Sequence, residues 1–134
     1  MIQEVHKIVK QSEGRRIIIA DSITSIDENN KNDVVVDGSH CGINVGHMVL
    51  KAGVRGMIGN DAGMGLDDAS IGSLKFLEEH GIPAAAVSSM SAEIGVGMDT
   101  YANGEISAVN EVAKKLGIAI GMSAKEAADR MFEG

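Results

Sequence analysis

Apolar positions along the chain follow two different spacings that alternate from one end to the other. Compact runs of β-branched and small apolar residues are typical of strands buried on both faces, and they occur at 16–20, 34–36, 55–59 and 84–87. Elsewhere apolar residues recur every three or four positions, which predicts helices at 2–12, 45–52, 68–80, 105–116 and 124–131. Strands and helices are therefore expected to alternate.

This alternation predicts the fold class. A chain of 134 residues has the length of one domain, and we expect residues 1–134 to form a single α/β domain. The expected architecture has three layers, α/β/α, with a mostly parallel sheet of four to five strands and helices on both faces. Such a sheet would be Rossmann-like or flavodoxin-like.

The connection between the first two strands leaves two topologies open. Residues 22–33 are polar, and Ser25 and Glu28 have the spacing of a capping box that could begin one short helical turn. A helical crossover would make the two strands parallel. A plain turn would make them a hairpin and would place Asp21 at the opposite edge of the sheet from Asp37.

Polar side chains follow each of the four predicted strands, at Asp21–Ser22, Asp37–Cys41, Asn60–Asp61 and Ser88–Ser89. Parallel strands bring such groups to one edge, where open α/β sheets bind their ligands. Asp, Asn and Ser also cap helices and make turns, and each residue taken singly is expected to do that. The site hypothesis depends on their joint occurrence.

The densest group, 37–42, predicts the chemistry of the site. We assign proton transfer to Asp37 and His40, with Asp61 as a third catalytic residue. Ligand contacts are assigned to Gly38, Ser39, Cys41, Asn60, Gly63, Ser88 and Glu93. A nucleophilic Cys41 with His40 as base is a weaker alternative, because a lone cysteine is more often a small buried hydrophobic residue.

A metal site is a further hypothesis. Asp37 and Asp61, optionally with Asp21, are carboxylates at neighbouring strand ends, which is a common way to hold Mg²⁺. His40 and His47 would share one face of a helix. Two helical turns, about 10 Å, separate them, which is too far for one ion.

Two glycine-rich loops, 59–65 and 91–103, allow a ligand to approach the backbone closely. Neither matches a Walker A motif or a dinucleotide fingerprint. The second loop resembles a lid, in which Glu93 would act as acid or base and Tyr101 as a hydrogen-bond donor.

Net charge and composition limit the classes of partner and the cellular location that we expect. A net charge of −7 and three aromatic residues argue against nucleic acid. No apolar stretch is long enough to cross a membrane, and Cys41, the only cysteine, forms no intrachain disulfide, so we expect a cytoplasmic protein. Small size and apolar, glycine-rich composition favour a homo-oligomer.

Three functions fit these features. The first is an enzyme, a hydrolase or lyase acting on a small polar or anionic metabolite at the carboxyl edge of the strands. The second is a non-catalytic module that binds or responds to an anionic metabolite. The third is a subunit whose site is completed by a partner chain.

Overall fold

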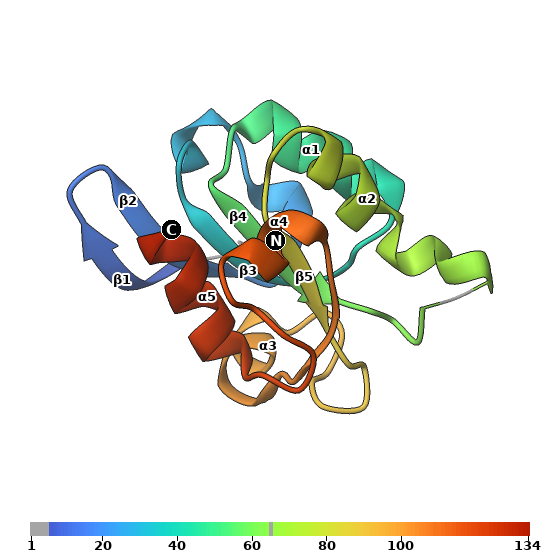
Figure 1. The fold of residues 1–134 in the computed structure, drawn as a ribbon. Coiled ribbons are helices and arrows are strands. Elements are labelled where there is room, and N and C mark those ends of the chain that lie inside the picture. Colours follow the sequence, from blue (N-terminus) through green and yellow to red (C-terminus); the bar gives the residue numbers. More distant parts are fainter. Residues whose placement is uncertain (1–5, 65) are drawn as a thin grey trace, which may run out of the picture.

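The computed structural model describes residues 6–64 and 66–134 as an α/β fold around a six-stranded mixed sheet (Figure 1). The strands are β1 (Lys7–Ser12), β2 (Arg15–Ala20), β3 (Val34–His40), β4 (Gly56–Asn60), β5 (Ala84–Val87) and β6 (Ile106–Val109). They lie in the sheet in chain order. β2 to β5 are parallel, whereas β1 and β6 run antiparallel at the two edges.

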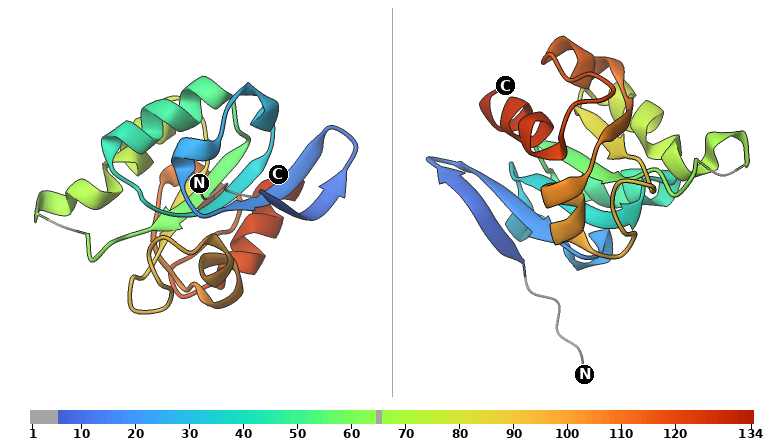
Figure 2. Two further views of the ribbon diagram at one scale, coloured as in Figure 1. Left: turned by 180° about the vertical axis from the view of Figure 1, so that it is seen from behind. Right: turned by 90° about the horizontal axis from the view of Figure 1, so that it is seen from below.

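Helices cover both faces of this sheet, as the sequence predicts (Figures 1 and 2). α1 (Ile43–Ala52) and α2 (Gly72–Glu79) pack on one face. The opposite face carries α3 (Gly97–Asn103), α4 (Glu111–Lys115) and α5 (Ala124–Glu133). Within the described residues, no helix has both the length and the apolar character that a membrane span requires.

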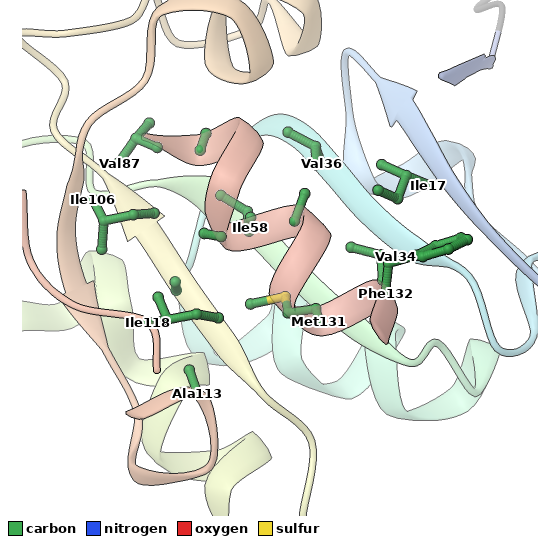
Figure 3. Close-up of a cluster of buried hydrophobic side chains, with 14 of the residues drawn as sticks. Ile17, Val34, Val36, Ile58, Val87, Ile106, Ala113, Ile118, Met131 and Phe132 are labelled. Atoms are coloured by element: carbon green, nitrogen blue, oxygen red, sulfur yellow. The ribbon is translucent and has the colours of Figure 1, made fainter. Parts of the chain in front are cut away.

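Alternate residues of the central strands supply two hydrophobic cores. Val34 and Val36 of β3 point towards α5, and Figure 3 shows this cluster around Met131 and Phe132. Val35, between them, belongs to the cluster beneath α1 and α2. Both faces of the central strands are therefore buried, which explains why these strands appear in the sequence as unbroken apolar runs.

The connection from β2 to β3 makes the two strands parallel, with Ala20 opposite Asp37. It contains two short 3-10 helices, Ile23–Ser25 and Glu28–Asn30. The capping box of the second joins Asp27 to Asn30, so the Ser25–Glu28 box is wrong. Because the strand order never reverses, the sheet lacks the switch point of the Rossmann and flavodoxin orders.

The helix predicted at 2–12 is wrong for its described part, because β1 occupies Lys7–Ser12; residues 2–5 lie outside the described residues. β1 forms a hairpin with β2, and Ser12 pairs with Arg15 across the turn. Gly14 has a φ of 72° in this turn. A glycine in the left-handed region ends helices as well as hairpin strands, so the sequence signal was ambiguous.

The helix predicted at 105–116 is wrong in its first half, where β6 lies, whereas its second half contains the short α4. Asn110 separates the two and caps α4 by accepting a hydrogen bond from the Ala113 amide. The loop predicted at 91–103 includes α3 from Gly97 onward. The helix predicted at 68–80 begins as a 3-10 segment, Leu66–Ile71, and the residue preceding α2 is Ile71.

Candidate functional site

The carboxyl ends of β2 to β5 meet at one edge of the sheet, as their parallel register requires. His40 lies opposite Asn60, and Asn60 opposite Val87. The segments that begin at Asp21, Asp37, Asn60 and Ser88 therefore share this edge, which we call the strand-end edge. The open question about Asp21 is resolved, because it lies on the same edge as Asp37.

Asp37 and Cys41 lie beneath the surface of the strand-end edge, and both are fully buried. The Asp37 Oδ1 atom accepts a hydrogen bond from the Ser39 amide at 2.8 Å. Burial raises the pKa of the Cys41 thiol, and the negative charges of Asp37 and Asp61 raise it further. A protonated, buried thiol is a poor nucleophile, so the arrangement favours a packing role for Cys41.

Asp61 is anchored by three hydrogen bonds. Its Oδ1 accepts from the amides of Gly63 at 2.8 Å and Ser89 at 3.0 Å, and its Oδ2 accepts from the Ser107 hydroxyl at 2.7 Å. Burial raises the pKa of the carboxyl, but the bonds from Ser107, Gly63 and Ser89 outweigh burial and lower the pKa below its usual value. Asp61 is therefore an ionised carboxylate that joins its own loop to the loop after β5 and to β6.

This anchoring predicts an acid-dependent stability. Because the pKa of Asp61 is lower in the folded than in the unfolded chain, its contribution is present at neutral pH and lost as the pH falls through the folded value. The stability advantage of the wild type over Asp61→Asn should therefore shrink below about pH 4, as measured by urea unfolding at several pH values. An advantage that stays constant to about pH 3 would contradict the prediction.

The loop after β4 uses its polar groups internally. The Asn60 Oδ1 atom accepts from the Ala62 amide at 2.8 Å, while its Nδ2 donates to the Ala92 carbonyl at 3.1 Å. The Gly63 amide is bonded to Asp61 and the Met64 amide to the Asp61 carbonyl. These three amides are thus already satisfied, and within the described residues 59–64 the loop is a folded turn that does not offer them to an anion.

Glycine at position 38 allows a second loop to pack onto the strand-end edge. The Gly95 amide donates to the Gly38 carbonyl at 2.7 Å, and a Cβ at Gly38 would lie 2.5 Å from the Val96 nitrogen. The Asp21 carboxylate accepts from the amide of Gly97, the first residue of α3, at 3.0 Å. The predicted lid, loop 91–103, is therefore packed against β2 and β3. The absence of a Cβ at Gly38 allows this contact.

The other predicted ligand contacts are divided between structural and exposed positions. The Ser39 and Ser88 hydroxyls accept from the amides of Ile23 at 3.0 Å and Met90 at 3.1 Å. Glu93 is exposed. Tyr101 packs against the core beside α5, with the Lys125 ammonium 5.7 Å from its ring, and its role as a hydrogen-bond donor to a ligand stays a prediction.

His40 is the exposed imidazole of the strand-end edge, and its protonation pattern is fixed by the backbone. The Gly42 amide lies 2.9 Å from the His40 Nδ1 atom. An amide can only donate, so Nδ1 must accept, and the neutral ring carries its proton on Nε2. No described residue forms a hydrogen bond with Nε2. The glycine two residues after the histidine is the one feature of the sequence that points to this tautomer.

No family model, curated protein or solved structure matches this chain significantly.

The metal hypotheses gain no support from the geometry. Among the described residues, no group of three or more His, Cys, Asp and Glu side chains is arranged to hold an ion. The expectation that His40 and His47 share one face of a helix is wrong, because His40 belongs to β3, whereas His47 lies on α1. The His47 ring packs against the Phe76 ring, with their centroids 4.4 Å apart. An Mg²⁺ site at Asp37 and Asp61 stays a prediction.

Proposed function

We propose that the chain binds a small polar or anionic molecule at the strand-end edge, and that His40 contacts this ligand. The hydrogen bond from the Gly42 amide to Nδ1 carries the proposal, because it presents Nε2–H as a fixed donor towards a ligand oxygen. α1 begins directly after Gly42 without a side-chain cap. Its positive N-terminal dipole would favour negative charge beside His40.

This geometry supports a particular chemical role for the imidazole. A ring that donates from Nε2 stabilises negative charge on an oxygen atom, but it has no vacant nitrogen with which to remove a proton. If the protein is a hydrolase or lyase, His40 would therefore act as an electrophile, and the base would be another group such as Glu93. Asp37 and Asp61 would then have structural roles, since Asp37 accepts from the Ser39 amide within β3 and Asp61 accepts from the Gly63 and Ser89 amides of two loops.

A thermal-shift titration tests the proposal. Acetate and acetamide are the probes, and we expect at least one of them to raise the melting temperature of the wild type. His40→Ala should abolish the shift, whereas His47→Ala, which changes an exposed imidazole on α1, should keep it. An equal shift in wild type and His40→Ala would overturn the assignment of His40.

Enzymatic and purely binding functions differ in one further respect. A binding module leaves its ligand unchanged, whereas a hydrolase cleaves it. NMR spectra of acetamide, the probe with a hydrolysable bond, followed over time therefore distinguish the two functions. A homo-oligomer, a cytoplasmic location and a site shared with a partner chain stay predictions.

A further inference from the structure

A polar hollow lies at the edge of the sheet opposite the strand-end edge, where β2 begins and β3 is about to begin. Its volume is about 360 Å³, which is within the usual range of small-molecule sites. We call it the basic hollow. It is lined by the end of β1, the hairpin turn and the turn before β3, with Gln11, Ser12, Gly14, Arg15, Arg16, Asn29, Lys31 and Asp33 at its surface.

The lining of the basic hollow is positive although the chain as a whole carries a net charge of −7. It contains three cations, Arg15, Arg16 and Lys31, and one carboxylate, Asp33. Arg16 neutralises Asp33 in a two-pronged pair, with Nε and Nη2 donating at 2.9 and 2.6 Å. Arg15 and Lys31 make no ion pair with any described residue. Two positive charges are left uncompensated.

Arg15 and Lys31 contact the rest of the protein in ways that leave N–H donors available to a ligand. One Arg15 nitrogen, Nη1, donates to the Phe132 carbonyl, and the guanidinium lies 5.8 Å from the Phe132 ring. A guanidinium has five N–H donors, so most remain for a ligand. The stem of Lys31 lies against Gly53, where a Cβ would be 3.4 Å from the lysine Cγ.

The walls of the hollow are tied to the rest of the fold. The Asn32 side chain donates to the Gly14 carbonyl of the hairpin turn and accepts from Arg55 at 3.2 Å. Burial lowers the pKa of the Arg55 guanidinium, and the nearby charge of Arg15 lowers it further. Arg55 therefore adds a third positive charge close to Arg15 at this edge.

We propose that the basic hollow binds the phosphate group of a small phosphorylated molecule through Arg15 and Lys31. A phosphate monoester carries about −1.5 to −2 charges at neutral pH, which matches the two uncompensated cations better than a single carboxylate does. The planar fork of an arginine fits two phosphate oxygens, and a lysine adds a point charge. This site is separate from the strand-end edge and does not depend on His40.

Isothermal titration of the full chain with pyrophosphate at low ionic strength tests the inference. Lys31→Gln should raise the Kd about tenfold, the effect expected for one lost charge-assisted contact. The matched control is Lys51→Gln, which removes the same charge from an exposed position on α1 and should change the Kd less than about twofold. Arg15→Gln combined with Lys31→Gln should abolish measurable binding.

Three results would overturn the inference. The first is no heat of binding in the wild type at millimolar pyrophosphate. The second is equal weakening by Lys31→Gln and Lys51→Gln, which would show attraction by overall charge alone. The third is binding that is lost in His40→Gln and kept in Lys31→Gln, which would place the anion at the strand-end edge. Circular dichroism spectra identical to wild type exclude unfolding as the cause of a loss.

Discussion

Exchange of Arg16 for methionine is expected to lower the free energy of unfolding by about 3–5 kcal/mol, because it leaves a buried carboxylate without its cation. The Asp33 side chain is only 3% exposed and receives both prongs of Arg16. After the exchange, Asn30, which donates from 3.2 Å, is the side chain that still bonds this carboxylate. Urea unfolding followed by circular dichroism measures the loss.

The two partners of this pair should not be equivalent. The Arg16 side chain is 30% exposed, so water can solvate the guanidinium once its partner is gone, and Asp33→Asn should cost less, about 1–3 kcal/mol. Lys10→Met is the control, because Lys10 and Asp129 form a pair with both side chains over 40% exposed, and it should cost about 1 kcal/mol or less. Equal losses in Arg16→Met and Lys10→Met would contradict the argument from burial.

The central part of the fold could be predicted because its strands are buried on both faces. Ile17–Ile19 and Val34–Val36 send alternate side chains into two cores, and only an unbroken apolar run satisfies both. The predicted end of α1 at residue 52 is confirmed, and Gly53, which follows it, has a φ of 75°. Burial on two sides and a left-handed glycine are local signals, and the sequence contains both.

The two antiparallel edge strands could not be predicted in the same way. β1 is largely exposed, so its composition is mixed, and Ile8 is 46% exposed although it lies in a strand. β6 alternates buried with half-buried residues over only four positions. Such short, one-sided strands lack the run of apolar residues that identified the others, and their pairing with β2 and β5 depends on tertiary contacts.

Because the central strands are parallel, the sequence predicts which residues lie at the strand-end edge. It does not predict the role of each residue there. Asp61 is a residue type that is typical of catalytic and metal-binding sites. In the structure, its carboxylate instead accepts hydrogen bonds from Gly63, Ser89 and Ser107. Ser89 and Ser107 come from segments distant in the chain. Their alignment with Asp61 is a product of the packed sheet, and no spacing in the sequence encodes it.

The second large effect is expected at Asn110, where replacement by alanine should lower the free energy of unfolding by about 3 kcal/mol, as several buried groups lose their partner. Asn110 is 4% exposed. Its Nδ2 donates to the carbonyls of Leu74 at 3.0 Å and Ile82 at 2.9 Å. Its Oδ1 accepts from the amides of Ala84 at 3.2 Å and Ala113 at 2.9 Å. One side chain thus joins α2, β5 and α4.

Ser123→Ala separates this joining role from ordinary helix capping. Ser123 caps α5 from an exposed position by accepting from the Glu126 amide at 3.2 Å, and its loss should cost about 1 kcal/mol. Asn110→Asp keeps the acceptor oxygens but loses both N–H donors, so at neutral pH it should be no more stable than Asn110→Ala. If Asn110→Ala costs no more than Ser123→Ala in urea unfolding, the buried bonds to Leu74 and Ile82 add nothing beyond the cap.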